Sequence, residues 1–168
     1  SAYWSYLAGA AGFTYGCNDV WQMYSIGDQP VIFARTGWEA ALQLPGAQQM
    51  KYVKKLFTAL PWHQLENNQA AILNENNPGQ QFMMAATTFN KDLMLVYTPV
   101  GEKVKVDLSV LNPERLQAYW YNPRSGKSKP AGEYTNSDKP ELIPWSHGEG
   151  SDFILVFVNE KSDFLSVF

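Results

Sequence analysis

Short strand-like segments separated by turn signals occupy the chain from residue 70 onward, and they constrain its fold more than any other feature. In KVKVDL the apolar residues Val104, Val106 and Leu108 alternate with charged ones, which predicts a strand with one buried face. FILVFV is apolar throughout, which indicates a strand covered on both faces. The other such segments are QFMMAATTF, LMLVYTP and LQAYWYNP, separated by NPGQ, FNKD, VGEK and NPRSGK, with a short strand expected around Leu142 and Ile143. This spacing predicts an all-β antiparallel sandwich of about 90 residues.

The first 62 residues have a different texture, with helical periodicity. The segment PGAQQMKYVKKLFTALPW predicts an amphipathic helix of about four turns that is preceded by Pro45 and Gly46 and stopped by Pro61. Its apolar residues recur every three or four positions: Met50, Val53, Leu56, Phe57 and Leu60. A second helix is expected over AYWSYLAGAA, which ends close to Gly12.

Between these two helices lies FTYGCNDVWQMY, which is rich in aromatic and β-branched residues and therefore predicts a strand. One strand cannot form a sheet by itself. The N-terminal region therefore has an α/β texture in which the predicted strand needs neighbours that the sequence does not obviously supply.

Composition and charge exclude several classes of function. The net charge is −3 and the densest basic group is Lys51, Lys54 and Lys55, so the chain lacks the basic surface of a nucleic-acid-binding protein. No apolar run is long enough for a transmembrane helix, and residues 1 onward lack the features of a signal peptide. With one cysteine, Cys17, and two histidines, we expect no intrachain disulfide, no metal site and no cofactor.

Residues able to carry catalysis are few. Glycoside hydrolysis needs two carboxylates on opposite sides of the scissile bond, but the spacing of the acidic residues specifies no such pair. Asp19 in NDVW suits the end of a strand beside a sugar-stacking tryptophan, but a turn or a helix cap is the simpler interpretation of Asn18 and Asp19. The G-x-S-x-G motif is absent and Cys17 has no nearby histidine, so we assign no catalytic residue.

Aromatic residues are the better candidates for binding, because their flat apolar faces stack on sugar rings. Side chains alternate along a strand, so either Trp120 or its neighbours Tyr119 and Tyr121 should face outward from the sandwich. We therefore expect this trio to supply a binding face or a domain interface.

Several segments together resemble the C-terminal part of a group of bacterial glycoside hydrolases that includes apiosidase-like enzymes. The most specific are YWSYLAGAAGFTYGCNDVW and YWYNPRSGK, and the similarity continues through GWEAALQLPGAQQMKYVKKLFTALPWHQLENNQ, LMLVYTPVGEKVKVDLSVL and DFILVFVN. In that group a (β/α)8 barrel of the TIM type precedes a small β-sandwich that is catalogued as a collagen-binding domain of a collagenase. The resemblance therefore implies an α/β fragment, the last helix, strand and helix of a barrel, followed by the sandwich.

The resemblance also implies a division of the chain and a set of site residues. Residues 1–65 would supply the seventh helix (2–11), the eighth strand (12–22) and the eighth helix (46–60) of the barrel, and residues 66–168 the sandwich. Because active sites of such barrels lie at the carboxyl ends of the strands, four residues are expected near a sugar subsite. These are Tyr15, Asn18, Trp21 and Trp38.

The two catalytic carboxylates of the family would lie upstream of Ser1, so the resemblance implies a chain that is inert alone. It would associate with the N-terminal barrel portion of the same enzyme and bind a plant-type oligosaccharide or polysaccharide. Such enzymes are usually exported, which implies a secreted, periplasmic or cell-surface location.

Two other interpretations stay open. The sandwich can be a stand-alone binding module for polysaccharide or a collagen-like protein, or a stabilising cap without a ligand. In addition, residues 3–24 would expose apolar faces if separated from a barrel, which predicts homo-oligomerisation or association with the missing portion.

Overall fold

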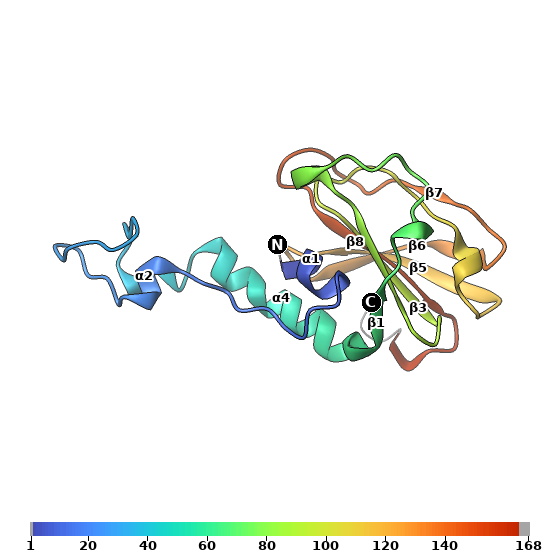
Figure 1. The fold of residues 1–168 in the computed structure, drawn as a ribbon, viewed down its shortest axis with the longest axis horizontal. Coiled ribbons are helices and arrows are strands. Elements are labelled where there is room, and N and C mark those ends of the chain that lie inside the picture. Colours follow the sequence, from blue (N-terminus) through green and yellow to red (C-terminus); the bar gives the residue numbers. More distant parts are fainter. Residues whose placement is uncertain (1, 165–168) are drawn as a thin grey trace.

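A six-stranded antiparallel sheet forms the centre of the computed structural model, which describes residues 2–164 (Figure 1). Its strand order is β1-β2-β3-β8-β5-β6, while β4 and β7 form a separate two-stranded sheet. The strands are β1 (Leu65–Asn67), β2 (Met84–Thr88), β3 (Leu93–Thr98), β4 (Val104–Lys105), β5 (Arg115–Asn122), β6 (Lys127–Thr135), β7 (Glu141–Leu142) and β8 (Phe153–Asn159). Every pairing in both sheets is antiparallel, so the β-rich part of the expected fold is confirmed.

The strand patterns read from the sequence match the observed burial. In and after β4, Val104 and Val106 are buried while Lys105 is exposed, as the alternation predicts. The apolar residues of β8 are all buried, because this strand lies between β3 and β5 and is covered on both faces. The short strand expected around Leu142 is β7.

One face of the large sheet packs against the small sheet and the loops around it. This inner core contains Trp120 and Leu116 of β5, Phe153 and Phe157 of β8, and Leu142 of β7. Trp120 meets the ring of Phe153 at a centroid separation of 6.0 Å in an edge-on arrangement. The two sheets therefore enclose a continuous hydrophobic core, as in a sandwich.

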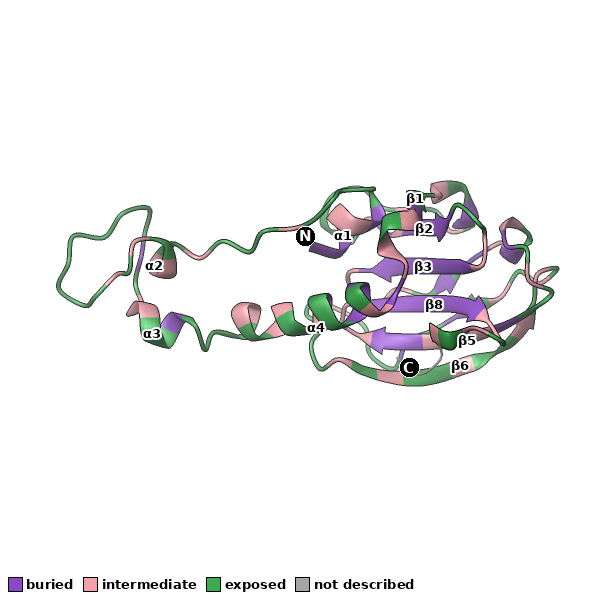
Figure 2. Ribbon diagram, turned by 90° about the horizontal axis from the view of Figure 1, so that it is seen from below, coloured by how far each residue is buried: buried purple, intermediate pink, exposed green. Residues whose placement is uncertain are grey.

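The opposite face of the large sheet is covered by α1 and α4 (Figure 2). The α-helices are α1 (Ala2–Leu7), α2 (Asn18–Trp21), α3 (Trp38–Ala41) and α4 (Pro45–Ala59), and short 3₁₀ turns lie at Trp62–Gln64, Gln69–Ala71, Gly79–Gln81 and Leu108–Val110. Leu7 and Leu56 are fully buried in this second core, and the rings of Tyr6 and Phe57 stack with centroids 4.1 Å apart. The molecule thus has three layers: small sheet, large sheet and helices.

Between α1 and α4 the chain leaves the sandwich as an arm and returns (Figures 1 and 2). We call residues 8–44 the arm and residues 17–44, which contain α2 and α3, its tip. Both helices predicted on either side of the arm are present, although α1 ends at Leu7, earlier than expected.

The strand predicted over residues 12–22 is wrong for this structure. Residues 13–17 lie outside any strand, and Asn18–Trp21 form the helix α2. A strand is stabilised by backbone hydrogen bonds to a neighbour, and no strand among residues 2–164 lies beside this segment. The barrel-fragment part of the expected fold is therefore not confirmed.

Candidate functional site

The tip of the arm is a small folded unit built around the side chain of Asp19 in α2. One carboxylate oxygen, Oδ1, accepts hydrogen bonds from the backbone N–H groups of Arg35 and Thr36, both at 2.7 Å. These bonds, with a weaker one from the thiol of Cys17, hold the pKa of Asp19 below its ordinary value. Asp19 therefore fixes the end of the loop that connects α2 to α3, and the sequence alternative of a turn residue fits this role better than that of a catalytic acid.

Two amide side chains of the same region hold the middle of that loop. Asn18 Nδ2 donates to the carbonyl oxygen of Ile32 at 2.8 Å, and Gln22 Oε1 accepts from the backbone N–H of Val31 at 2.8 Å. At and just after these anchors, Ile32 and Phe33 have φ angles of 48° and 62°, in the left-handed region that costs free energy for bulky residues. The loop is therefore held in a strained shape by contacts from α2 and Gln22.

The tip exposes an unusual amount of apolar surface. Trp21 is 72% exposed and Phe33 is 87% exposed, whereas Trp38 at the start of α3 is half-buried. Other exposed apolar residues of the tip are Met23, Ile26, Val31, Ile32, Leu42 and Leu44. Contacts between α2 and α3 bring Asn18, Trp21 and Trp38 into one unit, and these are three of the four residues predicted near a sugar subsite.

The fourth, Tyr15, lies apart from the tip. Its ring packs over Gly46 in the first turn of α4, where a Cβ atom would come within 2.9 Å of the tyrosine hydroxyl oxygen. A larger residue at position 46 would push this ring away. Glycine at this helical position, which costs stability in isolation, therefore allows the close approach.

Of the two roles expected for the aromatic trio of the sandwich, a binding face or a domain interface, the structure shows an interface for Tyr119 and Tyr121. Trp120 is 4% exposed and Tyr121 is 0% exposed, while Tyr119 is half-buried. The side chains do alternate, but Trp120 enters the core between the sheets and Tyr119 and Tyr121 enter the core beneath the helices. Tyr121 even donates its hydroxyl to the backbone carbonyl of Tyr52 in α4 at 2.9 Å. Because helices cover the second face of the sheet, Tyr119 and Tyr121 lie between the sandwich and the helical layer rather than on an exposed surface.

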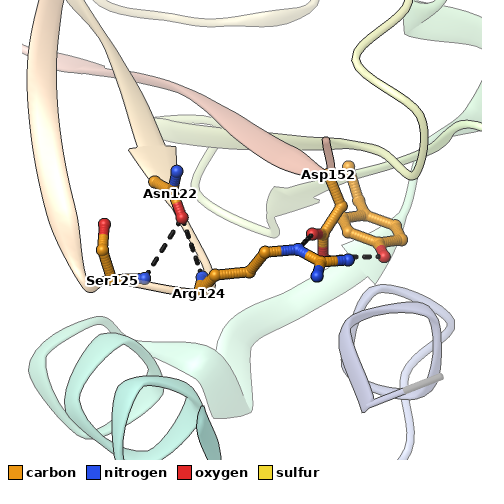
Figure 3. A network of polar contacts seen from close by, with 5 residues as sticks. Asn122, Arg124, Ser125 and Asp152 are labelled. Atoms are coloured by element: carbon orange, nitrogen blue, oxygen red, sulfur yellow. Dashed lines mark hydrogen bonds and ion pairs between the residues drawn. The ribbon is translucent and has the colours of Figure 1, made fainter. Parts of the chain in front are cut away.

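The NPRSGK motif forms a polar junction between the sandwich and the helical layer (Figure 3). Asn122 Oδ1 accepts from the backbone N–H groups of Arg124 and Ser125, which fixes the turn after β5. Arg124 Nε then donates to Asp152 Oδ1 at 2.7 Å, and the hydroxyl of Tyr97 donates to Asp152 Oδ2 at 3.3 Å. The sequence signals the turn, but it does not reveal the pairing of Arg124 with Asp152 or the contribution of Tyr97.

Among residues 2–164, no group of three or more histidine, cysteine or acidic side chains is arranged to hold a metal ion. His147 faces Glu102 at 3.1 Å on an exposed loop. No helix within the same range has the length and apolarity needed to cross a membrane.

Comparison with known families divides the chain into two parts. Residues 1–64 match the family described as "Apiosidase-like, catalytic domain", and residues 67–158 match the family described as "Putative collagen-binding domain of a collagenase". No curated protein matches the chain.

Solved structures match nearly the whole chain. One, a glycoside hydrolase, is 30% identical with a TM-score of 0.89, and the match covers 97% of this chain and 36% of that one. Another, a glycoside hydrolase family 5 protein from Bacteroides vulgatus ATCC 8482, is 31% identical with a TM-score of 0.89, covering 97% of this chain and 35% of that one. The chain thus spans about a third of the length of these structures. The N-terminal segment of the chain is similar to apiosidase-like catalytic domains. Because the second family matches more than half of the residues, the chain belongs to the family described as "Putative collagen-binding domain of a collagenase".

Proposed function

We propose that the chain is the C-terminal portion of a carbohydrate-active glycoside hydrolase. It contributes the closing elements of a (β/α)8 barrel, and its sandwich is an accessory domain that packs against the last two helices of that barrel. The match of residues 1–64 to an apiosidase-like catalytic domain supports this, as does the similarity of 97% of the chain to longer glycoside hydrolases.

The observation that carries the proposal is the arm. Residues 13–17 lie outside any strand, no strand among residues 2–164 lies beside them, and the tip exposes Trp21 and Phe33. Apolar side chains and extended backbone in such a setting are stabilised when neighbouring strands cover them. In the proposed enzyme the arm lies beside the other barrel strands, and the N-terminal barrel portion is the partner of the chain.

The proposed activity belongs to the complete enzyme rather than to this chain. A glycosidase needs an acid and a second carboxylate on either side of the bond that it cleaves. The Oδ1 atom of Asp19 is occupied by the loop that it organises. The proposed substrate is a plant-type oligosaccharide or polysaccharide, and the proposed location of the enzyme is outside the cytoplasm.

Within this proposal, Trp21 and Trp38 are the residues placed nearest to a sugar subsite. Asn18 acts on the loop through its bond to Ile32, and Tyr15 acts on the packing of α4. The rival proposal of a sandwich that binds a glycan or collagen-like protein through Tyr119, Trp120 and Tyr121 loses its support, because these side chains lie in the two cores.

The test compares the intact gene product with the 168-residue chain on nitrophenyl glycosides and plant oligosaccharides. We expect hydrolysis by the intact product alone. Trp21→Ala in the intact product should lower kcat/KM by up to about tenfold, the equivalent of one lost aromatic contact. Ile143→Ala, which changes an exposed residue of the sandwich, is the matched control. Hydrolysis by the 168-residue chain itself, or an intact product without activity on any of these glycosides, would contradict the proposal.

A further inference from the structure

A cavity of about 250 Å³ lies where the arm, α1 and α4 meet the sandwich. Its walls include Phe13 and Tyr15 of the arm, Gln49 of α4, and Tyr97 and Asp152 of the sandwich. Neither the proposed subsite at the tip nor the two family matches account for it. Its volume is smaller than the roughly 300–1,000 Å³ typical of pockets for drug-sized ligands, so it suits a small molecule.

The polar side of the cavity carries the carboxylate of Asp152, whose charge is balanced by Arg124. Asp152 receives Arg124 Nε at 2.7 Å and the hydroxyl of Tyr97 at 3.3 Å, and its side chain is largely covered. Because each carboxylate oxygen can accept more than one hydrogen bond, Asp152 keeps capacity for further donors. With Arg124 balancing its charge, the site favours a neutral ligand that donates hydrogen bonds over an ionic one.

Tyr3 lies beside Asp152 in the wall of the cavity. Its ring stacks on Tyr97 with centroids 5.5 Å apart, and the residue is 6% exposed. Its hydroxyl has no hydrogen-bond partner among residues 2–164, although such a buried hydroxyl costs about 1–3 kcal/mol when unpaired. Burial raises the pKa of Tyr3, and the nearby carboxylate of Asp152 raises it further, so the group stays a neutral hydroxyl. Because the hydroxyl oxygen is closed to solvent, a ligand in the cavity contacts the ring of Tyr3 and not its hydroxyl.

The remaining walls are apolar and flat. The rings of Phe13 and Tyr15 border the cavity, and Tyr15 is held over Gly46 by the close approach described above. Flat aromatic faces suit the C–H faces of a sugar ring, while the amide of Gln49 can both donate to and accept from hydroxyl groups.

We propose that this cavity, which we call the junction site, binds one neutral polyhydroxylated ring of monosaccharide size. The ring lies against the aromatic walls and its hydroxyl groups bond to Asp152 and Gln49. The junction site is distinct from the subsite proposed at the tip and does not depend on the hydrolase activity.

The test is a titration of the ¹⁵N-labelled 168-residue chain, followed by ¹H–¹⁵N NMR. The probes are D-xylose, D-glucose, myo-inositol and, as a ring with a single hydroxyl, cyclohexanol. We expect saturable shifts of the Gly46, Gln49 and Asp152 amides with at least one of the three polyols and none with cyclohexanol. Equal shifts with cyclohexanol would show a merely apolar pocket, and no saturable shift with any polyol would overturn the proposal.

Gln49→Ala is the decisive variant, because the side chain that it shortens borders the cavity. We expect at least a fivefold weaker affinity for the polyol, whereas Gln48→Ala, whose side chain instead bonds Leu42 and Gln43, should leave the affinity unchanged. Tyr3→Phe, which removes a hydroxyl that is closed to solvent, should keep the affinity and have unchanged or higher thermal stability. Equal affinity of Gln49→Ala and the parent chain would overturn the proposal.

Discussion

Gly126 lies where the turn after β5 packs against helix α4. Its φ angle is +66°, and a Cβ atom there would overlap the ring of Tyr52 in α4. The glycine therefore serves both the turn after β5 and the close packing of α4, and a side chain would disturb both.

Gly126→Ala is expected to destabilise the chain by about 1–3 kcal/mol, through left-handed backbone strain and overpacking. Gly148→Ala is the matched control, since Gly148 also has a positive φ but no neighbour within 4 Å of an added Cβ. Thermal unfolding of both variants, and of Gly126→Ala combined with Tyr52→Ala, separates the two effects. If Gly126→Ala and Gly148→Ala lose equal stability, and Tyr52→Ala restores none of it to Gly126→Ala, the contact with Tyr52 is unimportant.

The bonds made by the Asp107 carboxylate lead us to expect that the stability of the fold depends on pH. Its carboxylate binds Lys139 Nζ at 2.7 Å and accepts from the backbone N–H of Ser109 at 3.0 Å, and these bonds lower its pKa from 3.8 to about 2. A lowered pKa in the folded state means that the stabilisation is complete above about pH 4 and is lost as pH falls toward 2. Asp107→Asn should lower the free energy of unfolding by less than about 1 kcal/mol at pH 7. This difference in unfolding free energy between the variant and the parent should disappear by pH 2. A gap that is constant from pH 7 to 2 in chemical denaturation would refute this.

At the scale of elements, α4 matters most because one side of it faces the sheet and the other faces solvent. Leu56 lies on the buried side and is completely covered, whereas Leu42, just before the helix, is 42% exposed. The helix therefore belongs to the core of the sandwich even though its sequence matches a different family.

We expect Leu56→Ala to destabilise the sheet by about 2–5 kcal/mol, through lost burial and the cavity left behind. Leu42→Ala should change stability by about 0.5 kcal/mol or less. The readout is hydrogen exchange of the β3 and β8 amides, which should accelerate in Leu56→Ala alone. Unaltered exchange in both variants would mean that α4 contributes little to the sheet.

How far the sequence predicts each element depends on where its partners lie. Alternation in KVKVDL and uniform apolarity in FILVFV identify β4 and β8, because the apolar pattern of a strand indicates which of its faces are buried. The same alternation at Trp120 shows two faces but does not reveal that α1 and α4 cover the second one. Residues 12–22 have strand composition, yet backbone pairing depends on neighbours, and composition cannot provide them.

Part of the candidate site follows the same rule. The turn at NPRSGK is visible in the sequence, since asparagine, proline and glycine favour turns locally. The pairing of Arg124 with Asp152 joins residues 28 positions apart, and the cavity beside them also needs the arm and α4. Such contacts are products of the fold, so residue types alone do not predict them.

At the scale of the whole molecule, the arm is the feature most open to solvent. Exposed apolar patches favour association, so the 168-residue chain should self-associate with rising concentration. Replacing Ile32 by Asn and Phe33 by Gly removes apolar surface and also suits the positive φ angles. Sedimentation velocity should show a larger monomer fraction for this double variant than for the parent or for Phe89→Ser, a change of an exposed residue on the sandwich. An equal monomer fraction in all three would contradict the prediction.

Because α1 and α4 cover the large sheet, they limit which segments of this protein can be exchanged by recombination during evolution. Two family descriptions meet between residues 64 and 67, yet side chains from both sides of that point fill one core. A recombination event that moved residues 67–158 alone would leave Leu95, Tyr121 and Val156 without their cover. Recombination between enzymes is therefore expected to transfer the sandwich together with α1 and α4. The segment that is inherited together is then longer than the segment that matches the second family.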